Sequence, residues 1–166
     1  GVALKLEGRA YCFGDHVNTD LIIAGRYCHL ELAEMARHVM EDLDPHFVEN
    51  FETGGIIVAR RNFGCGSSRE EAPMSLKAAG VSCIIAQSFA RIFYRNCINV
   101  GLPILEAPTA AEGIEDGNLI EVDTSQGSIV DRSASSAYRA KPFPPFMMEI
   151  IEAGGLLAHT RKEIDN

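Results

Sequence analysis

A glycine-punctuated loop with two hydroxyls and a guanidinium is the part of this chain best suited to chemistry. The loop reads Asn62-Phe63-Gly64-Cys65-Gly66-Ser67-Ser68-Arg69-Glu70-Glu71-Ala72-Pro73. The apolar run 56–59 before it predicts a buried strand, and the apolar spacing over 74–79 predicts a helix after it. The loop therefore joins the end of a strand to the start of a helix, where free backbone N–H groups and the helix dipole favour an anion.

Ser67, Ser68 and Arg69 place polar side chains in that environment. Arg69 carries a planar fork of donors that suits a carboxylate, and the two serines lie where helix-capping residues belong. We therefore expect a small carboxylate ligand at this loop. Taken alone, the same residues fit a plainer interpretation equally well. Ser68 and Glu71 would form a capping box, while Arg69 would pair with an acid on the surface.

Other loop motifs fit these residues less well. The spacing Gly64-x-Gly66-x-x-Arg69 lacks the third glycine of a dinucleotide-binding loop, and no Gly-Lys-Ser/Thr follows as in a Walker loop. Gly66-x-Ser68-x-Glu70 lacks the second glycine of a nucleophile elbow. The loop is therefore not predicted to bind a nucleotide or to present an elbow serine.

Composition and charge restrict the class of protein. The chain has 166 residues, of which 46% are hydrophobic and 23% charged, as expected for one domain over 1–166. No apolar run approaches the ~20 residues of a membrane span, and we recognise no secretory signal, so we expect a cytoplasmic protein. The net charge of −8 argues against nucleic-acid binding. Five arginines are expected near the loop, where they would form a locally positive pocket for a small anion: Arg60, Arg61, Arg69, Arg91 and Arg95.

The five cysteines are expected to be free thiols. Their number is odd, and no Cys-x-x-Cys pair indicates a zinc or iron–sulfur site. We therefore predict that this chain binds no cluster by itself. Cys12, Cys83 and Cys97 lie in apolar patterns and are predicted core residues. Cys65 lies in the loop beside arginines, which would acidify its thiol, but no histidine at a recognisable spacing supports a nucleophilic role.

Strand and helix patterns alternate around the loop. Apolar patterns predict strands over 4–12, 56–59, 81–86 and 103–105. Helical spacing predicts helices over 31–43, 45–51, 74–79, 89–100 and 146–153. Ser88 is expected to cap the helix that Gly101 ends. This order of elements predicts a parallel α/β core.

Two further segments predict a small β appendage to that core. The stretches 119–122 and 128–132 read as a hairpin around Gln126-Gly127. The tail after Ala158 is polar and is expected to fray.

The central loop resembles the signature of the swivelling domain of the aconitase superfamily, particularly the small subunits of 3-isopropylmalate dehydratase and homoaconitase. Other segments resemble the same family in the same order. They are Gly14-Asp15-His16-Val17-Asn18-Thr19-Asp20, Gln87-Ser88-Phe89-Ala90-Arg91-Ile92-Phe93-Tyr94-Arg95-Asn96 and Asn99-Val100-Gly101-Leu102-Pro103. The resemblance extends from about residue 4 to residue 157. One departure is Glu71, where relatives usually carry histidine.

The resemblance implies a three-layer swivelling α/β fold and a role as the small subunit of a hydro-lyase in leucine biosynthesis. Enzymes of the family dehydrate and rehydrate a hydroxy-di- or tricarboxylate, and a [4Fe-4S] cluster with an open iron site is their Lewis acid. This chain shows no ligand set for such a cluster. The resemblance therefore implies a large iron–sulfur subunit as partner, in a heterodimer or heterotetramer.

The resemblance also implies roles for individual residues. Ser67 would be the catalytic base, and Ser68 would donate a hydrogen bond to the substrate or to an oxyanion. Arg69 would clamp a carboxylate, and Asp20 would reach the active site. Judged without the resemblance, the turn 15–20 fits plain Asx-turn chemistry. A serine alkoxide at neutral pH requires strong stabilisation, which a helix N-terminus, backbone N–H groups and arginines can supply.

Cys28, His29 and Leu30 bear on the choice of substrate. They follow the segment 25–27, after which relatives have a mobile loop that selects the substrate's side group. Homoaconitases usually place an arginine there, whereas isopropylmalate enzymes place apolar residues. Because this chain lacks the arginine, 3-isopropylmalate ranks first, ahead of homoaconitate and alkylmalates such as 2,3-dimethylmalate. His29 either meets a carboxylate, with an ordinary pKa of about 6.5, or points to solvent.

Two functions from other classes also fit the loop. One is a hydrolase that uses Ser67 or Cys65, and the other is a carboxylate-binding regulatory module anchored by Arg69. A hydrolase reacts with a serine- or thiol-directed covalent probe, and a binding module binds carboxylates alone. A subunit of a larger enzyme does neither well, which distinguishes the three.

Overall fold

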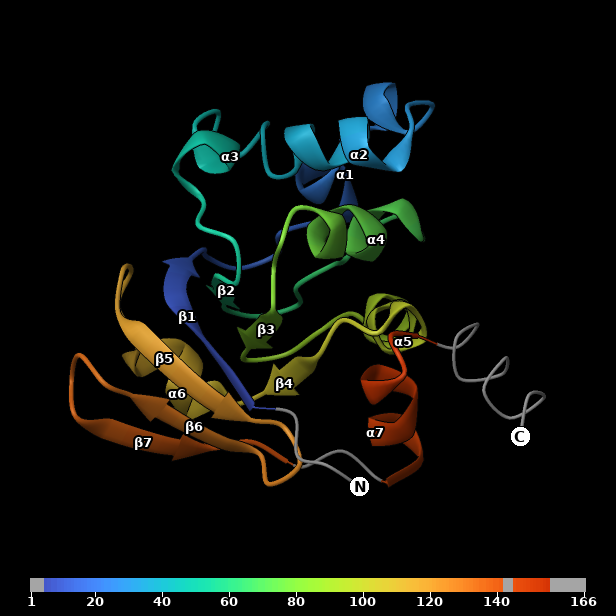
Figure 1. The fold of residues 1–166 in the computed structure, drawn as a ribbon. Helices are drawn as coiled ribbons and strands as arrows, with labels where there is room; N and C mark the ends of the chain where they lie inside the picture. Colours follow the sequence, from blue (N-terminus) through green and yellow to red (C-terminus); the bar gives the residue numbers. More distant parts are fainter. Residues whose placement is uncertain (1–4, 142–144, 156–166) are drawn as a thin grey trace.

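The computed structural model describes residues 5–141 and 145–155, and its framework is a seven-stranded sheet in the order β4-β3-β2-β1-β5-β6-β7 (Figure 1). Four strands pair in parallel: β1 (Lys5–Cys12), β2 (Ile56–Ala59), β3 (Cys83–Ala86) and β4 (Ile104–Glu106). Three pair antiparallel beyond β1: β5 (Leu119–Asp123), β6 (Ser128–Asp131) and β7 (Ser136–Arg139). The predicted appendage is thus continuous with the parallel core through β1.

The helices are mostly short, and they gather on the parallel half of the sheet. They are α1 (Thr19–Ile22), η1 (Gly25–Tyr27), α2 (Leu32–Met35), η2 (Ala36–His38), α3 (Phe47–Asn50), α4 (Glu71–Ala78), α5 (Arg91–Val100), α6 (Pro108–Gly113) and α7 (Pro145–Glu152). In Figure 1, α1 to α4 stand together, α5 and α7 lie beside β4, and α6 lies on the side of β5 to β7. None of the helices in the described part of the chain has both the length and the apolar character that a bilayer crossing requires.

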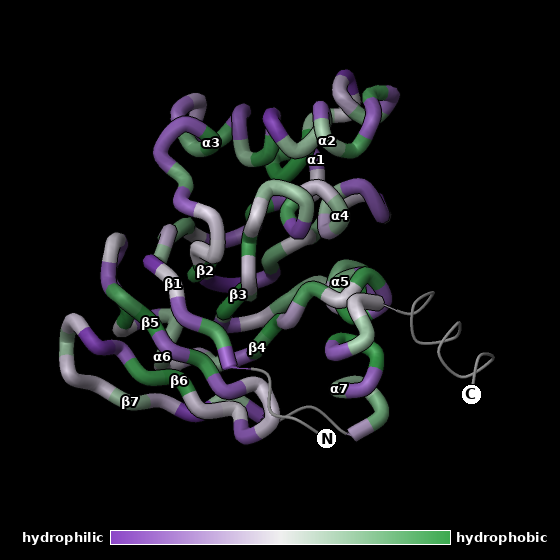
Figure 2. The backbone as a smooth tube through the Cα atoms, viewed as in Figure 1, coloured by the Kyte–Doolittle hydropathy of each residue, from purple (hydrophilic) through white to green (hydrophobic). Residues whose placement is uncertain are grey.

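Both faces of the central parallel strands β2 and β3 are buried, which produces three layers. Ile57 and Ile84 face a core that they share with α1, α4, α5 and α7. Ile56 and Ile85 face a second core, shared with α6 and the curled antiparallel strands. Burial on both faces explains why β2 and β3 are apolar throughout rather than alternating. Figure 2 shows polar stretches along the outer turns near α2 and α3 and also along the antiparallel strands and α7.

The structure corrects two of the predicted helical features. The predicted helix over 31–43 contains only α2 and η2, because the chain extends at Val39 and Met40 adopts a left-handed φ of 61°. Both side chains are fully buried, so core packing overrides the helical spacing here. The N-cap of α5 is Ala90, so Ser88 does not cap this helix. The Ser88 hydroxyl instead accepts a hydrogen bond from the Asn62 N–H.

Other features agree with the sequence patterns, and some were not foreseen. Gly101 ends α5 with a left-handed φ of 79°, as predicted. The helix α6 and the strand β7 were not predicted, since each is too short to carry a clear period. Leu4 and the tail after Ala158 lie outside the described residues.

Candidate active site

Three of the four segments that resemble one family, 14–20, 62–73 and 87–96, meet at the carboxyl end of the parallel strands. Asn18, from the first segment, forms an isolated parallel bridge with Cys65 of the central loop. Phe63, also in the loop, forms another bridge with Phe89 of the third segment. The site is therefore assembled from parts of the chain that are far apart in sequence, at the sheet edge where open α/β sheets bind ligands.

The glycines of the loop permit this close approach. Gly64 and Gly66 have positive φ values of 83° and 90°, which side chains of other residues rarely adopt. A Cβ atom at Gly64 would lie 2.1 Å from Cγ of Phe93 at the start of α5. Gly64 is thus required both for its conformation and for the packing of α5 against the loop.

Ser67 and Ser68 are exposed at the turn of the loop, and neither caps α4. The N-cap of α4 is Glu70, and no side chain accepts a hydrogen bond at that cap. The capping-box interpretation of Ser68 and Glu71 is therefore wrong. Both hydroxyls are free of a structural task, which leaves them available to a ligand.

Arg69 is held between two other segments. Its Nη2 lies 2.6 Å from Oδ1 of Asp20 in α1, and its Nη1 donates to Sγ of Cys28 at 3.4 Å. The Arg69 side chain is 24% exposed, whereas that of Asp20 is 61% exposed. The expectation that Arg69 pairs with an acid is therefore met, and the acid is one that the family resemblance places in the site.

Thr19, Ser67, Ser68 and Arg69 line a hollow of about 250 Å³, together with the start of α5. This volume suits a small organic acid. A larger groove of about 710 Å³ lies against α4 and α5, with Met74 and the methylene stem of Lys77 in its wall. The Lys77 ammonium there donates to the carbonyls of Val100 and Gly154, so it is not a free anion-binding group. The smaller hollow is therefore the better candidate.

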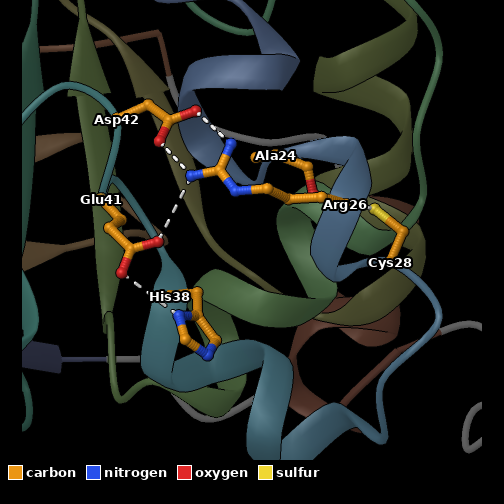
Figure 3. Close-up of polar contacts among 6 residues, drawn as sticks. All are labelled: Ala24, Arg26, Cys28, His38, Glu41 and Asp42. Carbon is orange, nitrogen blue, oxygen red and sulfur yellow. Dashed lines mark hydrogen bonds and ion pairs between the residues drawn. The ribbon is translucent and has the colours of Figure 1, made fainter.

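The segment before Cys28 is fixed by a polar network (Figure 3). The Arg26 guanidinium donates to both oxygens of Asp42, at 2.6 and 3.0 Å, and lies 3.6 Å from Glu41. Tyr27 stacks on His38 with 3.8 Å between ring centroids. Hydrogen bonds from Tyr27 and from His38 lower the pKa of the Glu41 carboxyl, and Arg26 lowers that of Asp42. These contacts hold Cys28 in place beside Arg69.

Of the three residues proposed to select the substrate, Cys28 contacts Arg69, although it does not itself line the hollow. The Cys28 thiol lies between the carbonyl of Ala24, at 3.7 Å, and the Arg69 guanidinium. His29 is exposed and Leu30 is half-buried, and neither lines the hollow. The histidine of the first segment, His16, contacts Asn62 rather than a serine of the loop.

Comparison with known proteins is consistent with this geometry. A family model described as the aconitase C-terminal domain matches residues 33–110. The 3-isopropylmalate dehydratase small subunit of Moorella thermoacetica is 50% identical over 160 residues, which cover 96% of each chain. Small subunit 2 of 3-isopropylmalate dehydratase from Archaeoglobus fulgidus is 52% identical over 164 residues, 98% of each chain. The chain belongs to the family of 3-isopropylmalate dehydratase small subunits.

A solved structure supports the fold of this family member. The structure of 3-isopropylmalate dehydratase from Methanocaldococcus jannaschii superposes with a TM-score of 0.91 at 42% identity, covering 96% of this chain and 95% of that one. The three-layer swivelling fold is therefore confirmed, with its parallel core and antiparallel extension.

The arginines of this family member are less concentrated at the site than the sequence suggested, whereas Cys83 and Cys97 are core residues, as expected. Of the five arginines, Arg69 and Arg91 line the hollow, while Arg61 pairs with Asp15 at 3.3 Å. Cys83 and Cys97 are fully buried, which raises the pKa of both thiols.

Cys12 and Cys65 lie nearer the surface. Cys12 is half-buried, and burial together with the Asp116 carboxylate raises its pKa to about 11. Cys65 is half-buried in the loop, where its carbonyl accepts a hydrogen bond from the Thr19 N–H.

The side chains of the described residues do not fit an iron–sulfur cluster. Such a cluster is held by several thiolates, with histidine an occasional substitute. Within 5–141 and 145–155, no three His, Cys, Asp or Glu side chains come close enough to hold a metal ion. A ligand set for the cluster of this enzyme family is thus not found in the described part of the chain.

Proposed function

We propose that this chain is the small subunit of a 3-isopropylmalate dehydratase, a hydro-lyase of leucine biosynthesis that isomerises a hydroxy-dicarboxylate. The observation that carries the proposal is the exposed Ser67-Ser68 pair beside the Arg69 guanidinium, in a hollow sized for a small acid. The names of relatives at about half identity over nearly the full chain support the same substrate.

The reaction sets two requirements, and this chain meets one of them. A carbon-bound hydrogen next to a carboxylate must be removed, and hydroxide must leave. For the first step Ser67, ionised to its alkoxide, takes the carbon-bound proton and becomes a neutral hydroxyl, while Arg69 holds the adjacent carboxylate by two parallel hydrogen bonds. Ser68 donates a hydrogen bond to the charge that develops on the substrate. Asp20 orients the Arg69 guanidinium through their ion pair.

The second requirement falls to a partner. Departure of hydroxide needs a Lewis acid, which a [4Fe-4S] cluster with an open iron site supplies in the family. We assign that cluster to a large subunit that faces the loop 64–69, in a heterodimer or heterotetramer. The donor groups of the described residues support this division, since they provide a base and a clamp but no cluster ligands.

The isolated chain is expected to show no dehydratase activity, because it supplies no Lewis acid. The test is to assay the purified chain with 3-isopropylmalate, alone and after the large subunit has been added. Co-purification of the native complex, with its visible absorption spectrum, reports whether an iron–sulfur partner is present. Robust turnover by the partner-free, metal-free chain would refute the proposed division of labour.

The reconstituted enzyme is expected to prefer 3-isopropylmalate to homoaconitate by at least about tenfold in kcat/KM, as expected when a charged group must enter an apolar site. We assign the contact with the alkyl group to Cys28 because it lies beside Arg69, whereas His29 is exposed and does not line the hollow. His29→Ala is therefore expected to leave the preference unchanged.

The assay compares 3-isopropylmalate, homoaconitate and 2,3-dimethylmalate in parallel. His46→Ala is the matched control, because His46 is also exposed but lies at the start of α3, away from the hollow. A strong preference for homoaconitate that collapses in His29→Ala but not in His46→Ala would show that His29, rather than an apolar wall, selects the substrate.

A further inference from the structure

Thr19 is a buried hydroxyl residue at the start of α1, directly before Asp20. Only 2% of its surface is exposed, and its Oγ1 donates a hydrogen bond of 2.7 Å to the carbonyl oxygen of Ser67. Within the described part of the chain, this is the only hydrogen bond that Ser67 or Ser68 forms. Among the described residues, the Thr19 hydroxyl is thus the one hydrogen-bonding partner of the Ser67–Ser68 pair itself.

This hydrogen bond continues a row of backbone hydrogen bonds between residues 17–19 and residues 64–65. The N–H of Gly64 donates to the carbonyl of Val17 at 2.8 Å, and the N–H of Thr19 donates to the carbonyl of Cys65 at 2.9 Å. The row of backbone hydrogen bonds ends at Cys65. The Thr19 side chain extends it by two residues, to the peptide that links Ser67 to Ser68.

That peptide needs an anchor. Gly66 immediately precedes Ser67 and has a φ of 90°, and glycine adopts positive and negative φ about equally readily. A trans peptide is planar, so fixing the Ser67 carbonyl also fixes the opposite direction of the Ser68 N–H. No acceptor among the described residues binds the N–H groups of Ser67, Ser68 or Arg69. Holding the Ser67–Ser68 peptide in one orientation therefore aims one of these donors, the Ser68 N–H, in a fixed direction.

We propose that Thr19 is a positioning residue for the dehydration reaction: its hydroxyl fixes the Ser67–Ser68 peptide and so orients both the Ser67 side chain and the Ser68 N–H. This inference rests on the proposed role of Ser67 as the base. Under this proposal α1 positions two groups of the site, because its next residue, Asp20, also holds the Arg69 guanidinium. One short helix then supports the base through its backbone and the clamp through an ion pair.

The first test replaces Thr19 by valine, which has nearly the same shape but no hydroxyl, and by serine, which keeps the hydroxyl. In the reconstituted complex, Thr19→Val is expected to lower kcat by about 10- to 100-fold, since a small displacement of a reacting group costs up to about this factor. KM should change little, because Arg69 keeps its own contacts. Thr19→Ser should retain most of the wild-type kcat.

A second measurement separates positioning from a general loss of fold. The backbone ¹⁵N–¹H signal of Ser68 in the isolated chain should shift in Thr19→Val and stay near its wild-type position in Thr19→Ser. The urea midpoints of both variants are recorded alongside. Equal losses of kcat in both variants, each matched by the same fall in midpoint and with no selective Ser68 shift, would show a merely structural role and overturn the inference.

A double-variant cycle distinguishes failure of this inference from failure of the proposed function. If Thr19 acts through Ser67 and the Ser68 N–H, Thr19→Val should lower kcat by a clearly smaller factor in a Ser67→Ala background than in the wild type, since effects of groups that act as a unit are not additive. Full multiplicative loss would refute the coupling. Wild-type kcat in Thr19→Val alone would refute the role of Thr19 and leave Ser67 as the base. Wild-type kcat in Ser67→Ala would instead refute the proposed base.

Discussion

Replacement of Ser67 by alanine is expected to lower kcat of the reconstituted dehydratase by about 10²- to 10⁴-fold, the range typical of losing a general base. KM should change little, because Arg69 still holds the substrate carboxylate and a base acts chiefly in the transition state. The Ser67 hydroxyl is exposed and makes no hydrogen bond among the described residues, so its removal should not disturb the fold. Steady-state kinetics with 3-isopropylmalate measure both constants.

The control for this variant removes a serine hydroxyl elsewhere. Ser136 lies on β7, the outermost antiparallel strand, and Ser136→Ala should keep wild-type turnover. If Ser67→Ala also keeps wild-type turnover in the complex, then Ser67 is not the base. Ser68→Ala, tested in parallel, shows whether the neighbouring hydroxyl performs the task instead.

Arg69→Lys is expected to lower kcat/KM by roughly ten- to more than a hundredfold, which corresponds to one lost hydrogen bond to a charged group at about 1.5–3 kcal/mol. KM should rise as well, since the clamp acts on bound substrate and transition state alike. The guanidinium touches Asp20 with one nitrogen and Cys28 with the other, so its plane is set by the fold. A lysine ammonium is a point charge and cannot keep this planar, two-pronged geometry.

Arg61→Lys is the matched control for that variant. Arg61 also pairs with an aspartate, Asp15, but its side chain is 69% exposed and it does not line the hollow. An exposed pair of this kind contributes little to stability, so Arg61→Lys should leave kcat/KM near wild type. Equal losses in Arg61→Lys and Arg69→Lys would point to a general electrostatic effect, and no loss in Arg69→Lys would exclude a carboxylate clamp.

Local patterns in the sequence determined the parallel core and the location of the loop. The strands β2 and β3 were recognised because both of their faces are buried, which makes them continuous apolar runs. Gly101 marked the end of α5, since only a residue that tolerates a left-handed φ ends a helix in this way. The resemblance of four motifs to one family identified the chemistry, and the comparisons confirmed that family.

Only the tertiary structure decided how those motifs combine. Arg69 and Asp20, which form an ion pair, are 49 positions apart in the sequence. Thr19 and Ser67, joined by the hydrogen bond to the Ser67 carbonyl, are 48 positions apart. The spacing of residue types along the sequence does not predict such contacts, because they depend on which strands become neighbours in the sheet. The same cause explains the broken helix over 31–43, where the burial of Val39 and Met40 outweighed local helical preference.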